Sequence, residues 1–150
     1  MIKVISKSRE ETIRAGKALA KRLKRGAVVA LIGELGSGKT VFTKGIAEGL
    51  GVGDCRYVNS PSFVIVKEYK ARRIPLYHFD IYRLGRLDSL DTIGYDEYFY
   101  GDGVTVIEWA DKIKGLLPKR RVEVRIIIRS AASREIKIKG LWQETHRKSR

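Results

Sequence analysis

The chain has 150 residues, 43% of them hydrophobic, which is enough for one domain with an ordinary core. Its 31 Lys and Arg against 17 Asp and Glu give a formal net charge of +14. This charge favours a polyanionic partner but does not identify which polyanion it is. The single cysteine, Cys55, excludes an internal disulfide framework, and no apolar run approaches the roughly 20 residues that cross a bilayer. We therefore expect one cytosolic domain over residues 1–142, without a membrane segment, followed by a flexible basic tail at 143–150.

The amino-terminal pattern predicts a strand over residues 2–6 and then a helix. Ser8 and Glu11 have the S-x-x-E spacing of a capping box, in which each side chain accepts from the other residue's backbone N–H. Gly26 is expected to stop the helix at a left-handed C-cap. The stripe expected to be buried consists of Ile13, Gly16 or Lys17, Ala20 and Leu23.

Strands and helices then alternate along the chain. The continuously apolar residues 27–32 predict a central strand covered on both faces, and residues 41–50 predict a helix that ends at Gly51. Residues 63–69 and 74–79 indicate a hairpin, residues 87–98 a helix, and residues 104–107 another buried strand. Residues 122–128 and 135–138 indicate a last antiparallel pair. The fold class expected is α/β with a mixed central sheet.

Residues 33–40 match the phosphate-loop pattern G-x-x-x-x-G-K-[S/T] in full, directly between a predicted buried strand and a predicted helix. Glycines let successive backbone N–H groups converge on a phosphate, the lysine lies against the β- and γ-phosphates, and the threonine hydroxyl ligates Mg²⁺. The only asparagine, Asn59, is not in an N-K-x-D element, which favours ATP over a guanine nucleotide. The predicted nucleotide-binding loop is Gly33, Glu34, Leu35, Gly36, Ser37, Gly38, Lys39 and Thr40.

Two acids, Glu108 and Asp80, follow predicted strands at the carboxyl ends of the sheet strands, which would face this loop. Glu108 closes the run 104–107, which is typical of a fully buried parallel strand, whereas Asp80 closes a strand that Pro75 and the preceding hairpin place nearer the edge of the sheet. We assign Glu108, together with Thr40, to the metal, and Asp80 to a position facing the γ-phosphate and the attacking water. On this argument the two acids could exchange roles, and either could be an ordinary strand-end residue.

Four further residues have two interpretations each. Ser62 offers a hydroxyl where a γ-phosphate switch would lie, or belongs to a plain Ser-Pro turn. Trp109 packs beside the nucleotide or fills a core edge. His78 is favoured as a packed or half-exposed strand residue over a catalyst. Arg83 supplies positive charge to the transition state or forms a surface ion pair.

In this order the motifs resemble the TsaE (YjeE) family of P-loop ATPases. The carriers of the resemblance are the phosphate loop, then residues 58–63 (VNSPSF), 77–84 (YHFDIYRL), 95–99 (YDEYF) and 106–109 (VIEW). The resemblance covers residues 12–117 and, more weakly, the final strands. It implies a three-layer P-loop NTPase-like domain that binds ATP and Mg²⁺ and associates with the proteins TsaB and TsaD. In that family ATP hydrolysis supports transfer of threonylcarbamoyl to the tRNA adenosine beside the anticodon.

The resemblance also implies roles for individual residues. Lys39 and Thr40 would serve phosphate and metal, and Glu108 the metal. The family usually has Ser-Pro-Thr in the loop where this chain has Ser62, so the hydroxyl survives without the methyl group. The residues assigned to the nucleotide region are Asp80, Ser62 and Trp109, with Thr12 and Arg134 approaching from the first helix and the last strand pair.

Two other classes of function fit parts of the sequence. A small-molecule P-loop kinase would need an acceptor pocket and a helical lid, whereas the segment after the loop's helix indicates a hairpin. A basic RNA-binding module with a vestigial nucleotide site would use the positive charge alone. The leading hypothesis remains an ATP hydrolase. Because the only glutamine, Gln143, lies in the tail and no glutamine orients water, we expect hydrolysis to be slow without partners.

Overall fold

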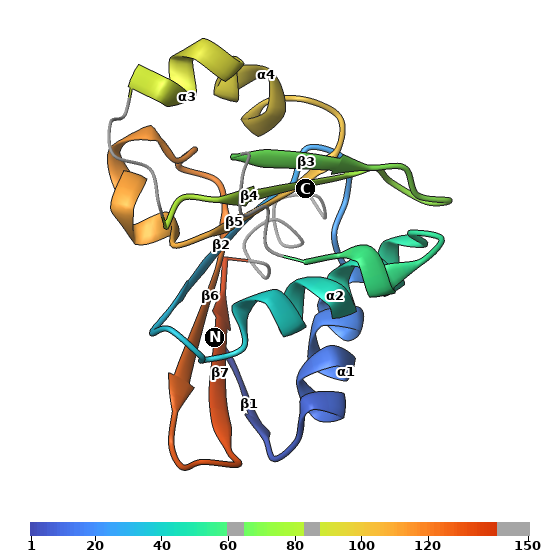
Figure 1. Ribbon diagram of the computed structural model, residues 1–150, viewed down its shortest axis with the longest axis vertical. Coiled ribbons are helices and arrows are strands. Elements are labelled where there is room, and N and C mark those ends of the chain that lie inside the picture. Colours follow the sequence, from blue (N-terminus) through green and yellow to red (C-terminus); the bar gives the residue numbers. More distant parts are fainter. Residues whose placement is uncertain (60–64, 83–87, 141–150) are drawn as a thin grey trace, which may run out of the picture.

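The computed structural model describes residues 1–59, 65–82 and 88–140. Within them a seven-stranded sheet has the order β1-β7-β6-β2-β5-β4-β3, as Figure 1 shows. Strand β2 is parallel to β5 and β6, and β4 is parallel to β5, whereas β1/β7, β6/β7 and β3/β4 are antiparallel. The strands are β1 (Ile2–Ser6), β2 (Val28–Gly33), β3 (Val66–Tyr69), β4 (Leu76–Asp80), β5 (Val104–Glu108), β6 (Val122–Ile128) and β7 (Arg134–Lys139).

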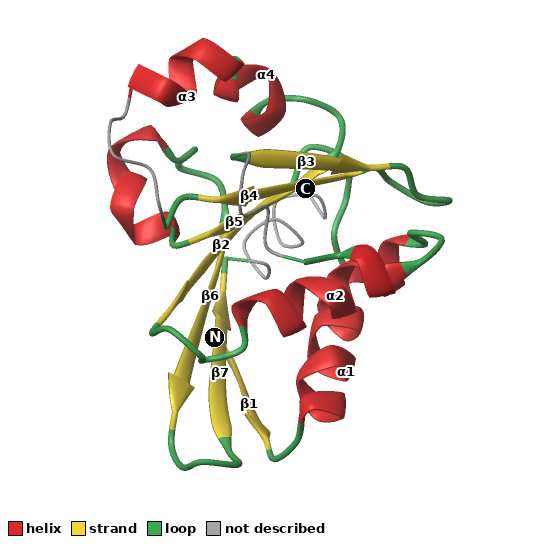
Figure 2. Ribbon diagram, in the orientation of Figure 1, coloured by secondary structure: helices red, strands yellow, loops and turns green. Residues whose placement is uncertain are grey.

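Helices cover both faces of this sheet, which makes three layers (Figures 1 and 2). Helices α1 (Arg9–Ala20) and α2 (Lys39–Leu50) lie on one face. Helices α3 (Asp88–Ile93) and α4 (Tyr95–Phe99) and the 3₁₀ segment η2 (Ala110–Leu116) lie on the other. A short 3₁₀ turn, η1 (Cys55–Tyr57), follows α2. No helix in the described ranges is long and apolar enough to cross a membrane.

Strand β2 lies at the centre because both of its faces are apolar. Val29 and Leu31 pack into the cluster under α1 and α2, and Val28 and Ala30 into the cluster under α3, α4 and η2. The alternation of a strand sends successive side chains to opposite faces, so an unbroken apolar run is stable only between two covering layers. The predicted mixed sheet, with antiparallel additions at both edges, is confirmed.

Helix α1 is shorter than the sequence predicts. It ends at Ala20, not at Gly26, and Gly26 (φ +88°) belongs to a later turn whose N–H bonds to Gly103. The cause is tertiary: the Arg73 guanidinium donates to the carbonyls of Ala20 and Leu23 at 2.9 and 2.6 Å and satisfies the helix end. The buried stripe also shifts by one residue at its start, where Thr12 is buried and Ile13 only partly so. Lys17, one of two alternatives at its position, is exposed.

Two further boundaries differ from the prediction. The Ser8 hydroxyl accepts from the Glu11 N–H as expected, but the Glu11 carboxylate accepts from the Lys7 N–H and not from that of Ser8. The helix expected over residues 87–98 is divided into α3 and α4 at Gly94 (φ +70°), because a left-handed residue cannot continue a helix. The predicted tail at 143–150 lies outside the described residues.

Helices α1 and α2 approach each other through glycines. A Cβ on Gly16 would collide with the Phe42 carbonyl oxygen, and one on Gly45 with the Ile13 carbonyl oxygen. The two backbones are therefore in direct contact, and this contact fixes where the start of α2 lies over the sheet.

We expect Gly45→Ala to lower the free energy of unfolding by about 1–3 kcal/mol, because overpacking outweighs the roughly 1 kcal/mol that alanine gains in a helix. Gly53→Ala is the matched control, since a Cβ there would meet nothing within 4 Å. Urea unfolding of both variants tests this, and equal midpoints would show that the helices do not depend on the close approach.

Candidate functional site

The phosphate loop joins the end of β2 to the start of α2 and depends on its glycines. Gly36 and Gly38 adopt φ values of +80° and +108°, which other residues rarely reach. A Cβ on Gly33 would lie 2.5 Å from the Ser37 Oγ and 2.8 Å from the Ile126 carbonyl oxygen. Gly38 caps α2 without a side-chain hydrogen bond. The loop thus presents the amino end of a helix whose cap makes no side-chain hydrogen bond, which is the arrangement that binds phosphate.

Lys39 is only 5% exposed and is held inside the loop. Its Nζ donates to the carbonyls of Gly33 and Glu34 at 2.8 and 3.0 Å and lies 3.9 Å from the centre of the Trp109 ring. Burial lowers the pKa of Lys39, against the opposing pull of the nearby acids, Glu108 first. The ammonium group is therefore poorly solvated and surrounded by weak acceptors, so a phosphate would be a stronger partner than those it has.

Thr40 and Glu108 meet at the carboxyl ends of the parallel strands. The Thr40 hydroxyl lies 3.0 Å from each oxygen of the Glu108 carboxylate, which is only 3% exposed. The structure therefore brings the two residues that sequence reasoning assigned to the metal into direct contact. A hydroxyl and a carboxylate are oxygen ligands of the kind that Mg²⁺ prefers.

His78, favoured from the sequence as a strand residue over a catalyst, is packed beside Glu108 in this site. It is 0% exposed, and its Nε2 lies 2.6 Å from the Glu108 Oε2. Because Nε2 faces a carboxylate, it carries the proton and donates, while Nδ1 is buried without a partner in the described residues. The available signal was the alternation of β4, which puts His78 on the same face as Asp80.

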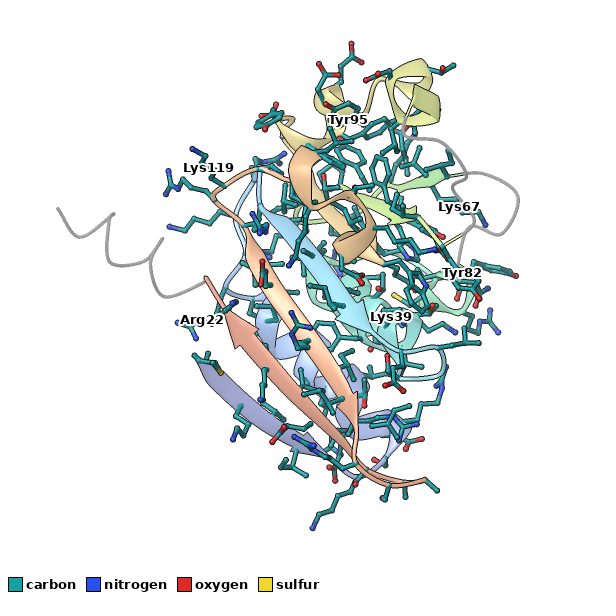
Figure 3. All side chains as sticks on the ribbon, turned by 90° about the vertical axis from the view of Figure 1, so that its left-hand side faces the viewer. Arg22, Lys39, Lys67, Tyr82, Tyr95 and Lys119 are labelled. Carbon is teal, nitrogen blue, oxygen red and sulfur yellow. The ribbon has the colours of Figure 1, made fainter. Side chains whose placement is uncertain are left out.

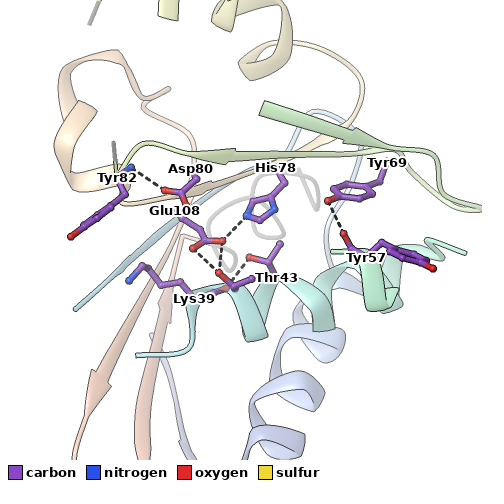
Figure 4. A network of polar contacts seen from close by, with 9 residues as sticks. Lys39, Thr43, Tyr57, Tyr69, His78, Asp80, Tyr82 and Glu108 are labelled. Atoms are coloured by element: carbon purple, nitrogen blue, oxygen red, sulfur yellow. Dashed lines mark hydrogen bonds and ion pairs between the residues drawn. The ribbon is translucent and has the colours of Figure 1, made fainter. Parts of the chain in front are cut away.

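Asp80 lies beside Glu108, since the two residues are paired across β4 and β5. Its Oδ1 accepts from the Tyr82 N–H at 2.9 Å, which fixes the carboxylate at the end of its strand (Figure 4). As the sequence indicated, β4 is nearer the edge of the sheet than β5. Both predicted acids thus face the phosphate loop from neighbouring strands, and Asp80 is close enough to favour the charged form of Lys39.

Trp109 contacts the site as well as the core. It has φ +61°, the only positive φ of a non-glycine residue in the described ranges, and its ring packs on the Lys39 ammonium and on the Tyr82 ring, whose centre is 4.8 Å away. Lys112 donates to the Tyr82 carbonyl at 2.8 Å. Such a backbone conformation costs on the order of 1–3 kcal/mol, so the surrounding contacts must hold it. The sequence assigned no role to Tyr82, although it lies in the 77–84 motif, or to Lys112, which lies in none of the motifs.

Thr12 and Arg134 approach the loop from opposite ends of the chain. The Arg134 guanidinium donates to the Ser37 and Gly36 carbonyls at 3.0 and 3.2 Å. Thr12 is buried, shares a hydrogen bond of 2.7 Å with the Ser6 hydroxyl, and lies next to Gly38. Arg134 therefore holds the loop, and Thr12 lies beside it. The remaining candidates, Ser62 and Arg83, lie outside the described residues.

Comparison with known proteins decides the family. The family model for "Threonylcarbamoyl adenosine biosynthesis protein TsaE" matches residues 6–136. This chain belongs to the TsaE family. The tRNA threonylcarbamoyladenosine biosynthesis protein TsaE of Bacillus subtilis is 48% identical over 129 residues, which are 86% of this chain and 78% of that protein. That of Treponema pallidum is 38% identical over 137 residues, 91% of this chain and 99% of that protein.

A solved structure agrees with this assignment. The crystal structure of Bacillus subtilis YdiB matches with a TM-score of 0.77 at 37% identity, over 99% of this chain and 96% of that one. The resemblance to the TsaE family and the P-loop fold class are therefore confirmed.

The geometry of this TsaE family member fits a nucleotide and Mg²⁺. The Ser37 Oγ is buried at the loop without a partner in the described residues, and Gly33 leaves no room for a side chain. In the described ranges no three His, Cys, Asp or Glu side chains gather as a metal site of their own. A cation bound by Thr40 and Glu108 would therefore complete its shell with phosphate oxygens and water.

We expect His78→Leu to lower the free energy of unfolding by about 1.5–3 kcal/mol, because the buried Glu108 carboxylate loses a donor. His78→Gln, which restores an N–H, should recover part of this loss. Thr105→Val is the control. Thr105 lies on β5, next to the strand of His78, and the substitution removes a hydrogen bond between two neutral groups, the Thr105 hydroxyl and the Tyr98 carbonyl. Denaturant unfolding measures all three, and a leucine variant as stable as the parent would remove His78 from its supporting role.

Proposed function

We propose that this protein is a Mg²⁺-dependent ATPase required for the formation of tRNA threonylcarbamoyladenosine, and that it hydrolyses ATP to drive or reset a transfer complex of TsaB and TsaD. The observation that carries the proposal is the contact of the Thr40 hydroxyl with both oxygens of the Glu108 carboxylate. Thr40 directly follows the buried Lys39. The names of the relatives support the pathway. The loop and the two acids support the chemistry.

Binding is assigned to the loop and to Lys39. The loop amides and the Lys39 ammonium would hold the β- and γ-phosphates, with Thr40 and Glu108 as metal ligands. Mg²⁺, when bound, neutralises charge on the phosphate oxygens. His78 keeps Glu108 in position by donating to Oε2, so that the carboxylate does not have to move when a cation arrives.

Asp80 and Trp109 are assigned to the hydrolytic step. Asp80, fixed by the Tyr82 N–H, would orient the attacking water and accept its hydrogen bond. The Trp109 ring covers Lys39 and restricts access of bulk water to the ammonium group. Ser62 is assigned to sensing the γ-phosphate. Phosphoryl transfer needs positioning and charge neutralisation more than covalent chemistry, and these groups would supply both.

Arg134 and Thr12 are assigned to shaping the nucleotide site. By holding the Ser37 carbonyl, Arg134 directs the N–H of the same peptide unit, that of Gly38, to the opposite side, because the two groups of a trans peptide point apart. Thr12 packs next to Gly38 from α1. Arg134, which lies on β7, would thus orient the loop amides for binding a phosphate.

The other two functions fit the site less well. In the described residues, β3 and β4 form a hairpin after α2 where a small-molecule kinase would need a helical lid. A vestigial nucleotide site would have no reason to keep a buried carboxylate in contact with Thr40, since burial of a charge is costly.

Two substitutions should separate nucleotide binding from metal use. We expect Lys39→Ala to weaken ATP binding at least tenfold with or without Mg²⁺, because the phosphates lose a buried cation. Glu108→Ala should keep much of the metal-free affinity and lose Mg²⁺-dependent turnover at least tenfold. Calorimetric titration with ATP, with and without Mg²⁺, and a phosphate-release assay measure these effects. Lys44→Ala, also on α2, is the control, and full activity of either site variant would contradict the assignment.

The dependence on partners is the direct test of the proposed function. We expect slow ATP hydrolysis by the isolated protein and an increase of at least tenfold when TsaB and TsaD are both added, because no glutamine stands among the described residues to orient water. Phosphate release and formation of the modified tRNA would be followed in the same reaction. Fast turnover by the isolated protein, unchanged by the partners, would refute the proposal.

A further inference from the structure

A second cavity lies at the amino ends of the parallel strands, away from the phosphate loop. It has a volume of about 510 Å³ and lies between the turn that leads into β2, the end of α4 and the segment before β6. The phosphate loop follows the other end of β2, which at roughly 3.3 Å per residue is about 20 Å away. Figure 3 shows Lys119 and Lys39 at opposite ends of the sheet. A ligand in this cavity would therefore not compete with a nucleotide.

The lining of this cavity carries positive charge only. It includes Lys24, Arg25, Lys119 and Arg120, from two separate segments, and no acidic residue. Lys24, Lys119 and Arg120 have no side-chain hydrogen bond or ion pair within the described residues, and Arg25 has only a long bond of 3.5 Å to the Arg73 carbonyl. Some surface cations of this protein are neutralised, for example Arg121 by Glu123, whereas these four form no ion pair within the described residues. The four cations are therefore available to an anionic ligand that makes several contacts.

An aromatic ring stands at the same cavity. Tyr100 lines it, is 68% exposed, and sits next to the buried Phe99 at the end of α4. A flat ring exposed beside several cations suits a ligand with both a π-face and phosphates, since bases stack on aromatic side chains while the backbone meets Lys and Arg.

The walls of the cavity are held by backbone bonds. Gly26 donates to the Gly103 carbonyl at 3.1 Å, and Gly101 donates to the Tyr98 carbonyl at 3.1 Å. Gly101 has no room for a side chain, because a Cβ would collide with the Glu97 carbonyl oxygen. The cavity is therefore formed before any ligand arrives, which lowers the entropic cost of binding.

We propose that this cavity binds a single-stranded stretch of RNA, with phosphates on Lys24, Arg25, Lys119 and Arg120 and one base stacked on Tyr100. That this RNA is a tRNA rests on the function proposed above. A second copy of the chain fits less well, because two molecules with a net charge of +14 repel each other. An acidic protein segment would pair with the cations but would not supply a base to stack on the exposed Tyr100 ring. A duplex would present a broad backbone surface and not an unpaired base.

The test measures RNA binding by the full chain through fluorescence anisotropy, with a labelled 20-nucleotide single-stranded RNA and an unmodified tRNA transcript as probes. We expect Lys119→Glu with Arg120→Glu to weaken binding at least tenfold and to reduce the salt slope by one to two, since about 0.7 counterion is released per single-strand phosphate. Lys67→Glu with Lys70→Glu changes the net charge equally at exposed sites on and next to β3, and should have little effect. Tyr100→Ala should weaken binding about fivefold or more, and Tyr100→Phe should not.

Separate outcomes bear on the inference and on the proposed function. Equal weakening by the two charge-reversal pairs, or no RNA binding by the parent protein, would overturn the inference. So would unchanged RNA binding with a changed sedimentation coefficient in the Lys119 and Arg120 variant, which would point to self-association. Lys39→Ala should bind RNA like the parent, and the charge-reversal variants should keep ATP binding and the unfolding midpoint. Failure of the ATPase test with cavity-dependent RNA binding intact would therefore reject only the proposed function.

Discussion

A buried carboxylate needs donors, and Glu108 obtains them from two neighbouring elements. His78 donates from β4 and Thr40 from the start of α2, so the two elements must meet at the end of β5. Because an unpaired charge in this position would cost several kcal/mol, the contact fixes the relation between the sheet edge and the phosphate loop. The same carboxylate opposes the loss of charge that burial imposes on Lys39.

The loop depends equally on parts of the chain that are far away in the sequence. Arg134, from β7, holds the carbonyls of Gly36 and Ser37, and Thr12 lies next to Gly38 from the first helix. The close approach of α1 and α2 is possible only because Gly16 and Gly45 have no side chains. The loop is therefore supported from the part of the chain that forms the antiparallel strands β1 and β7, whereas the two acids lie on the parallel strands β4 and β5.

The two ends of the parallel strands present different chemistry. The carboxyl ends gather Asp80 and Glu108 near one buried lysine, an arrangement suited to a metal and a nucleotide. The amino ends gather unpaired cations and the exposed Tyr100 ring around a preformed cavity. Four of the chain's cations thus lie at the opposite end of the parallel strands from the two acids.

The sequence by itself determined the features that rest on local pattern. The apolar run of β2, the glycines of the loop and the strand-end position of Glu108 each follow from neighbours in the chain, and the ordered motifs identified the family. Only the tertiary structure decided where α1 ends, because Arg73 satisfies its carbonyls from more than fifty residues away. It likewise decided that His78 serves Glu108 and that Trp109 covers Lys39. Such contacts join side chains across elements, and their energies depend on burial and distance, which spacing along a chain does not encode.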